Sequence, residues 1–217
     1  MNHWEAMTAR HSVRSYQDLP LSAEVITALE QQIDACNQES GLNIQLVTNE
    51  PKAFDSLMAH YGKFSGVTSY IALVGKKSAN LDETCGYYGE KLVLEAQKLG
   101  LNTCWVAMTY KKIPGAFQVG AGEKLTVVIA IGYGTTQGVA HTSKPADQVS
   151  NLASDSPAWF KKGVEAALLA PTAMNQQKFT FTYADGKVTA KAGMGFYSKV
   201  DLGIAKYHFE LGSGKKL

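Results

Sequence analysis

The sequence lacks several features that would assign it to a specialised class of protein. Its three cysteines, Cys36, Cys85 and Cys104, are an odd number with no CxxC pair, which argues against a disulfide framework and a zinc site. No apolar run approaches the roughly 18–20 residues that span a bilayer. Residues 1–6 also lack the charged and apolar regions of a signal peptide. We therefore expect a cytoplasmic protein without a membrane partner.

The chain also lacks an excess of charge of either sign. Its 21 basic and 19 acidic residues leave a net charge of +2, whereas a nucleic-acid-binding protein would show a concentrated basic stripe. The five histidines are not grouped as metal ligands, and no HExxH, GxSxG or Walker sequence occurs. We therefore expect no nucleic-acid partner and no metal. The hydrophobic fraction of 45% is normal for a globular protein with a core.

What is present is a regular succession of helical and strand patterns. Ser22 is a plausible N-cap for a helix of about four turns, and Ser156-Pro157 is a typical helix start, with Ser as N-cap. Asp185-Gly186 indicates a hairpin turn. Residues 125–131 form the most β-branched run and predict a central strand. The other expected helices are 3–9, 52–60, 86–99 and 201–211, the last closed by Gly212; the other expected strands are 43–48, 69–74, 178–183 and 187–191, and 103–108 is a short buried segment.

The order of these elements contains a faint internal repeat. A helix followed by a strand at residues 26–47 parallels a helix followed by a strand at residues 161–182, with a shift of 135 residues. One interpretation is a degenerate duplication, with a front half at 1–150, a rear half at 151–217 and a site at their junction. The alternative is that any two helix–strand units look this similar.

A short basic motif lies near the start of the chain. Arg10, His11, Ser12 and Arg14 place two guanidiniums, an imidazole and a hydroxyl within five residues. Arginine is preferred where a phosphate is held in a bidentate manner, so the motif could hold a phosphate. The alternative is a solvated basic patch at the C-terminus of a helix.

A second motif lies 160 residues later, at residues 170–177, with the sequence Ala-Pro-Thr-Ala-Met-Asn-Gln-Gln. Thr172 and Asn175 offer hydrogen-bonding groups for the edge of a flat heterocycle, and the small Ala173 permits close approach of a ring. The alternative is a proline-terminated helix with a polar corner. Lys144, in the polar connection 135–153, could reach a phosphate or lie on the surface.

These motifs resemble those of the nitroreductase family of flavoproteins. Arg-His-Ser-Val-Arg-Ser-Tyr at 10–16 is similar to the family's Arg-Arg-Ser-x-Arg-x-Tyr/Phe signature, and 170–177 is similar to its Ala-Pro-Ser-x-x-Asn-x-Gln segment. Residues 89–107 resemble the family's central helix and the following strand, and Ile131-Gly-Tyr-Gly resembles a family strand end. The resemblance implies an α+β fold with a mixed sheet flanked by helices, built from two similar halves.

The order of the motifs departs from the ordinary family pattern. There the Ala-Pro-Ser segment follows the first long helix, a place that residues 35–41 fill here without a match. This order resembles the divergent TM nitroreductase branch. In ordinary dimeric members one subunit supplies the arginine segment and the other the Ala-Pro-Ser segment. The chain therefore looks like a fused half-sized dimer that forms one site, as a monomer or as a homodimer.

The family's roles carry over to individual residues. The resemblance implies that Arg10, Ser12 and Arg14, with His11 alongside, hold the FMN phosphate and ribityl chain. Ala107 and Met108 would face the flavin, and Lys144 would be a late phosphate contact. Met108 replaces a common glycine of the family, and Lys178-Phe179 replaces Pro-Trp. The remaining residues expected to border the isoalloxazine are Pro171, Thr172, Ala173 and Asn175.

The activity that the resemblance implies is flavin-dependent oxidoreduction. NAD(P)H would reduce FMN, and a flat electron-poor acceptor such as a nitroaromatic or a quinone would then be reduced in a ping-pong cycle, with no catalytic side chain required. The alternatives are a different reductive reaction and a flavin- or ligand-binding protein of the same fold without turnover.

Overall fold

The computed structural model describes residues 1–217, which form two compact units. The sheet unit comprises Arg10–Leu81 and Leu92–Val139, and the hairpin unit comprises Met1–Ala9, Asp82–Lys91 and Ala140–Leu217. The proposed halves, 1–150 and 151–217, and the repeat between them stay predictions. None of the helices combines the length and the hydropathy that crossing a membrane requires.

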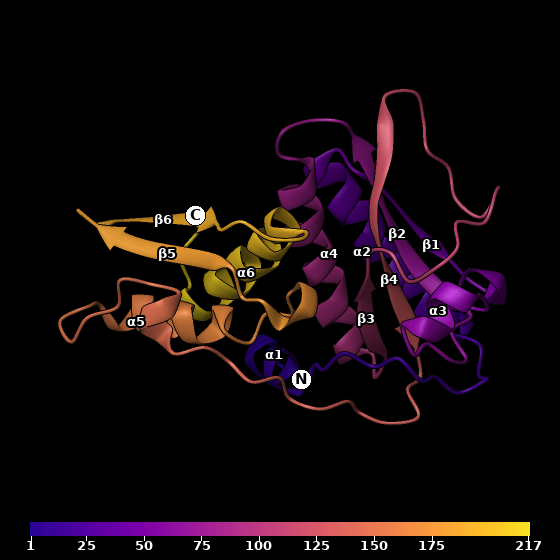
Figure 1. Ribbon diagram of the computed structural model, residues 1–217, viewed down its shortest axis with the longest axis horizontal. Helices are drawn as coiled ribbons and strands as arrows, with labels where there is room; N and C mark the ends of the chain where they lie inside the picture. The colour runs from indigo at the N-terminus through magenta and orange to yellow at the C-terminus, as the bar shows by residue number, and fades with distance from the viewer. The chain divides into compact units, whose positions relative to one another are not determined.

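The sheet unit is built around a four-stranded antiparallel sheet with the order β1-β2-β4-β3 (Figure 1). The two central strands are almost continuously apolar and buried, as strands covered on both faces should be. The expected central strand is therefore confirmed as β4. The strands are β1 (Asn43–Val47), β2 (Ser69–Lys76), β3 (Asn102–Val106) and β4 (Glu123–Gly132).

Helix α2 (Ala23–Ser40) packs against β1. The Ser22 side chain accepts a hydrogen bond from the Val25 N–H at 3.3 Å, which confirms the expected N-cap. Leu29, Ile33 and Cys36 are buried at helical spacing. The apolar face of α2 thus covers β1, while a core cluster of the unit packs strand residues such as Tyr70 and Val128 against Phe54 and Phe64.

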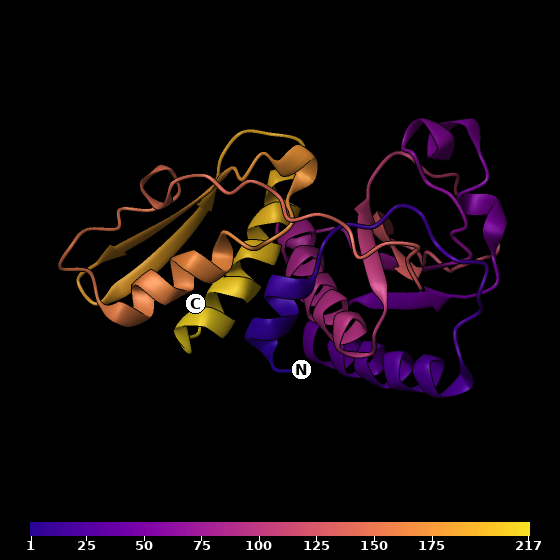
Figure 2. The ribbon, with the colours of Figure 1, turned by 90° about the horizontal axis from the view of Figure 1, so that it is seen from below.

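The hairpin unit combines three helices with the β5–β6 hairpin. Figure 2 shows α5 and α6 lying side by side, and the hairpin packs against α6. Asp185 and Gly186 both have positive φ, at 50° and 77°, as a type I′ turn requires. The rings of Phe181 and Phe209 stack with centroids 4.6 Å apart. The elements are α1 (His3–Ala9), α5 (Ala158–Ala167), β5 (Phe179–Ala184), β6 (Lys187–Ala192) and α6 (Ser198–Ser213).

Helix α4 (Leu81–Lys98) contributes residues to both units. It begins five residues before the expected start at Gly86. Within the hairpin unit, a Cβ at Gly86 would meet the Val200 carbonyl, and one at Gly203 would meet the Glu83 carbonyl. The two glycines therefore permit close approach of α4 and α6. Deeper in this contact, His208 Nε2 lies 2.8 Å from Glu90 Oε1, and both side chains are fully buried.

Helix α6, like α4, begins before its expected start, at Ser198 rather than residue 201. Three further sequence-based expectations are wrong. The expected helix 52–60 is instead a 3-10 turn, η1 (Pro51–Ala53), followed by α3 (Leu57–Tyr61), because Ser56 starts a new helix by accepting from the Ala59 N–H. Ser156 is not an N-cap; its hydroxyl accepts from the Ala153 N–H, and the extended Pro157 occupies that position. Gly212 lies inside α6 against Lys162 of α5, and Gly214, with φ 67°, ends the helix.

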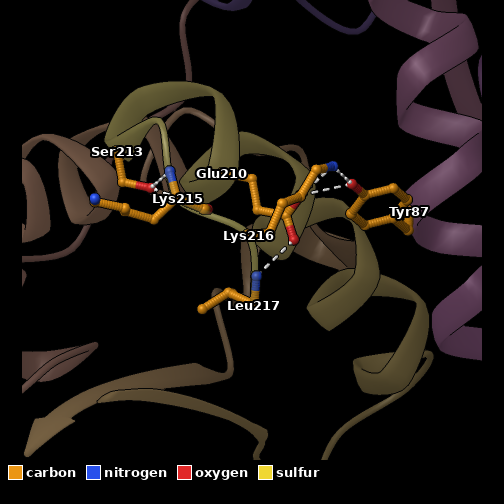
Figure 3. A network of polar contacts seen from close by, with 6 residues as sticks. All are labelled: Tyr87, Glu210, Ser213, Lys215, Lys216 and Leu217. Atoms are coloured by element: carbon orange, nitrogen blue, oxygen red, sulfur yellow. Dashed lines mark hydrogen bonds and ion pairs between the residues drawn. The ribbon is translucent and has the colours of Figure 1, made fainter. Parts of the chain in front are cut away.

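The residues that follow α6 are fastened to it by a polar network (Figure 3). The Tyr87 hydroxyl donates to Glu210 Oε2 at 2.6 Å and accepts from Lys216 Nζ at 2.7 Å. Glu210 also accepts from the Leu217 N–H at 3.0 Å. Burial and the hydrogen bond to Glu210 raise the pKa of Tyr87 to about 12, so the phenol stays protonated and available as a donor.

The α+β class is confirmed. Every strand pair in the two sheets is antiparallel. Parallel pairing is limited to isolated bridges, of which two, Ser12 with Thr103 and Ser15 with Ser65, belong to the arginine segment.

Candidate functional site

The arginine segment, residues 10–16, has an extended backbone in the sheet unit. The Val13 N–H donates to the Thr103 carbonyl, and the Tyr16 N–H donates to the Ser65 carbonyl, both at 3.0 Å. The segment is thus added beside β3 by main-chain hydrogen bonds. Because side chains alternate along an extended chain, Arg10, Ser12 and Arg14 share one side.

The neighbour that these three side chains share is the buried thiol of Cys104. Burial raises the pKa of this thiol, while Arg14, a hydrogen bond with Ser12, and Arg10 act in the opposite direction. Cys104 is 3% exposed and free. The opposing effects show that two positive charges and a hydroxyl gather at one place on β3, and the protonated thiol adds no negative charge there.

Arg10 and Arg14 are the chain's two arginines, against 19 lysines. Arg10 is buried, whereas Arg14 is exposed, forms no ion pair, and places its guanidinium carbon 5.9 Å from the centroid of the Phe64 ring. The ring limits the positions that the long side chain can adopt. Arg14 is therefore a held cation whose charge no carboxylate neutralises.

His11, Ala107 and Met108 belong to the same unit. The Cβ of His11 lies against Gly138, where an added Cβ would approach it to 2.7 Å. Ala107 and Met108 directly follow β3, and Met108 is 65% exposed. β3 thus connects the cluster around Cys104 to the two residues that were expected to face a flavin.

The second motif forms a tight corner in the hairpin unit. After α5 the chain turns through η3 (Ala173–Asn175). Met174, Asn175 and Gln177 have φ of 52°, 52° and 44°. Residues other than glycine rarely adopt such values, and each costs about 1–3 kcal/mol unless the surroundings enforce it. Clustered strain of this kind is typical of functional loops.

Side chains brace the corner from within. Gln177, which is 2% exposed, donates through Nε2 to the Thr142 carbonyl at 2.9 Å and to Asn175 Oδ1 at 2.8 Å. Lys144 Nζ donates to the Gln176 carbonyl at 2.7 Å. Asn175 Nδ2 also donates to the Thr142 carbonyl at 2.9 Å. The amide of Asn175 and the ammonium of Lys144 therefore fasten the corner to residues 142–144.

A buried acid on α6 completes the bracing. Asp201 is 2% exposed. Its carboxylate accepts from the Ala173 N–H at 2.9 Å and from Gln176 Nε2 at 2.7 Å. Burial raises the pKa of Asp201 to about 6, against the lowering effect of these two hydrogen bonds.

The structure brings the expected residues together in two groups, each within its own unit. The sheet unit holds Arg10, His11, Ser12, Arg14, Ala107 and Met108, and the hairpin unit holds Lys144, Pro171, Thr172, Ala173 and Asn175. That both groups form one site stays a prediction.

Sequence reasoning missed the roles of Phe64 and Asp201. An acid within the largely apolar run at 200–205 was the available signal for Asp201, but a position near a helix start already accounts for an acid. No local pattern singles out Phe64, because its partner Arg14 lies 50 residues away in the sequence.

Comparisons with known proteins decide the family. The sequence profile of the family described as "Putative TM nitroreductase" matches residues 2–213. The chain belongs to this nitroreductase family. No curated protein matches the chain.

Solved structures show the same fold. A nitroreductase from Thermotoga maritima has a TM-score of 0.68 and 24% identity, and the match covers 98% of this chain and 83% of that one. A nitroreductase from Desulfovibrio desulfuricans in complex with FMN has a TM-score of 0.52 and 18% identity, covering 72% and 99%. An NADH dehydrogenase/NAD(P)H nitroreductase from Parabacteroides distasonis has a TM-score of 0.53 and 21% identity, covering 69% and 97%.

Proposed function

We propose that this nitroreductase-family protein binds FMN and transfers electrons from NAD(P)H to a flat, electron-poor acceptor, which is reduced. For a quinone the overall reaction is quinone + NAD(P)H + H⁺ → hydroquinone + NAD(P)⁺. For a nitroaromatic the corresponding reaction is ArNO2 + NAD(P)H + H⁺ → ArNO + H2O + NAD(P)⁺. When bound, FMN supplies the two-electron chemistry that connects the nicotinamide with the acceptor.

The observation that carries the proposal is the placement of the chain's two arginines. Both lie in the arginine segment, which the hydrogen bond from the Val13 N–H to the Thr103 carbonyl places beside β3. A planar guanidinium matches a phosphate better than an ammonium does. The use of arginine here, in a chain otherwise rich in lysine, supports a phosphate-bearing ligand.

The donor set fits FMN. The phosphate requires cationic donors, and Arg14 is exposed and without an ion pair. The ring requires close approach and polar edges, and the corner offers small residues at Pro171 and Ala173. Asp201 accepts from the Ala173 N–H, and Thr172 Oγ1 accepts from the Gln177 N–H. We assign phosphate binding to Arg10, Ser12 and Arg14, and the ring border to Pro171–Asn175, Ala107 and Met108.

The work of these residues is positioning rather than proton transfer. The extended arginine segment is held by main-chain hydrogen bonds, and the corner is braced by side chains. Both devices lower the cost of ordering the protein around a ligand. We name no general acid or base.

The experiment is reduction of the purified protein by a nicotinamide. We expect a protein that is yellow, or becomes so with added FMN, and that NADH or NADPH bleaches without oxygen. A quinone should restore the colour. A colourless protein that takes up no FMN would contradict the proposal. A yellow protein that neither nicotinamide reduces would favour the alternative, a flavin-binding protein without turnover.

The proposed site can form within one chain or between two. A monomer by light scattering that binds one FMN per chain supports the site within one chain. A homodimer leaves exchange between subunits possible, and mixing two inactive variants, one in each motif, would then restore activity.

A further inference from the structure

A recess adjoins the corner at η3 within the hairpin unit. It has a volume of about 410 Å³ and is lined by Met174, Gln176, Lys178, Gly195 and Phe196, a size within the range of small-molecule sites, about 300–1,000 Å³. Met174 is 78% exposed and Phe196 is 68% exposed. Two large apolar side chains are thus presented to solvent beside the strained turn.

The walls of the recess are fastened to the core. Gln176 Nε2 donates to the Phe196 carbonyl at 2.6 Å and to the buried Asp201 carboxylate at 2.7 Å. The backbone that carries Phe196 is therefore anchored through one amide to α6. An anchored backbone at Phe196 reduces the ordering that is needed when a ligand binds.

Gly195 permits the close approach of the two walls. A Cβ at this position would collide with Gln176 Oε1 and would come within 2.9 Å of Lys178 Cδ. A larger residue would displace the amide of Gln176, which bonds the Phe196 carbonyl. The shape of the recess thus depends on one glycine beside the anchored amide.

The charge of the recess is positive. Lys178 is exposed and forms no ion pair, and none of the residues that line the recess is acidic. Aromatic and thioether side chains favour a flat ring, and an ammonium favours an anionic substituent. Together they fit an aromatic ring that carries a carboxylate.

We propose that this recess binds the electron acceptor and that the acceptor is an aromatic acid. Its ring packs on Phe196 and Met174, and its carboxylate faces the charge of Lys178. Reduction of the bound acid rests on the proposed function, since the electrons come from NAD(P)H. Binding of the acid does not.

The test measures binding of para-nitrobenzoate and of neutral para-nitrobenzyl alcohol to the purified protein by calorimetry, without a nicotinamide. We expect the acid to bind up to about fivefold more tightly than the alcohol, since a cation and a carboxylate at a partly exposed site gain up to about 1 kcal/mol. Lys178→Gln should remove this preference. Phe196→Ala should weaken both ligands about fivefold.

Two control variants test whether the loss of any exposed charge or ring alters binding of the acid. Lys187→Gln removes another exposed ammonium of the hairpin unit, and Tyr61→Ala removes another exposed ring, which is 83% exposed; neither should alter binding. Phe196→Leu replaces Phe196→Ala if thermal unfolding shows that the alanine variant is unstable.

Equal affinities for acid and alcohol in the wild type, or unchanged affinities in the two recess variants, would overturn the proposal. An FMN titration of the wild type separates the two claims. If the protein binds and reduces FMN but the recess variants bind the acid as tightly as the wild type does, only the proposal about the recess is overturned. Binding of the acid that depends on Phe196 and Lys178, without FMN uptake, would overturn the proposed function alone.

Discussion

The carboxylate of Asp201, on α6, accepts a hydrogen bond from the backbone N–H of Ala173 at 2.9 Å. The first residue of η3, within the strained corner, is therefore held by an acid that is almost completely buried. The stability of the protein and the geometry of a motif shared with flavoproteins depend on the same carboxyl group.

This relationship predicts a specific dependence of stability on pH. Burial raises the pKa of Asp201 from 3.8 to about 6, so between these values the folded state binds the proton more tightly than the unfolded state. The free energy of unfolding that Asp201 contributes is thus largest below pH 3.8 and falls as the pH rises through 6.

Asp201→Asn should remove this dependence. Relative to the variant, the wild type should lose roughly 2–3 kcal/mol of unfolding free energy between pH 4 and pH 7, measured by urea denaturation at a series of pH values. Asp147→Asn, at an exposed carboxyl, is the control and should run parallel to the wild type. If the free energies of unfolding of the wild type and of Asp201→Asn changed in parallel with pH, the pKa of Asp201 would not be raised in the folded state.

The positive φ of Met174, 52°, predicts an unusual tolerance of glycine. Met174→Gly should be neutral or should stabilise by up to about 1 kcal/mol, because glycine adopts this conformation without strain. Met174→Val should destabilise by about 1–3 kcal/mol. Met194→Val, at a 93% exposed position, is the control in thermal unfolding. A loss of stability on Met174→Gly would show that the side chain, and not the backbone, fixes the turn.

The buried pair of His208 and Glu90 predicts non-additive stability changes. Glu90→Leu should cost about 3–5 kcal/mol, because it leaves His208 without its carboxylate partner in the core. The double variant Glu90→Leu, His208→Phe should cost less than Glu90→Leu alone, although the 3.1 Å contact of His208 Nδ1 with the Ala166 carbonyl is lost. Urea denaturation of Glu90→Leu, of His208→Phe and of the double variant provides the double-mutant cycle. Additive costs would mean that the two side chains are not coupled.

The sequence predicts elements well where the deciding interactions are local. The N-cap at Ser22, the β-branched run of β4 and the Asp185-Gly186 turn depend on neighbouring residues, and all three are confirmed. Gly212 misleads because the same residue type that ends a helix also permits close packing of two helices. Its role is decided by α5, which lies 45 or more residues earlier in the chain.

The candidate site shows the same limit. Residue chemistry makes the arginine segment and the corner at 170–177 candidates, and the resemblance to the family supplies their expected roles. The bracing of that corner by Asp201 and Lys144 could not be predicted, because a lysine in a polar connection and an acid near a helix start have ordinary explanations. The positive φ at Met174 could not be predicted either, because methionine is not a residue type that favours a left-handed backbone.

The most direct test of the central claim is the affinity for FMN of the wild type and of Arg14 variants, measured by quenching of FMN fluorescence. Arg14→Ala should weaken binding more than tenfold, since loss of a charged phosphate partner costs about 1.5–3 kcal/mol. Arg14→Lys should recover only part of the loss, because an ammonium does not form the bidentate contact. Lys112→Ala, which removes an exposed charge from the same unit, should bind FMN like the wild type. FMN affinity that is unchanged in Arg14→Ala, or equally reduced in Lys112→Ala, would contradict the assignment of the phosphate to the arginine segment.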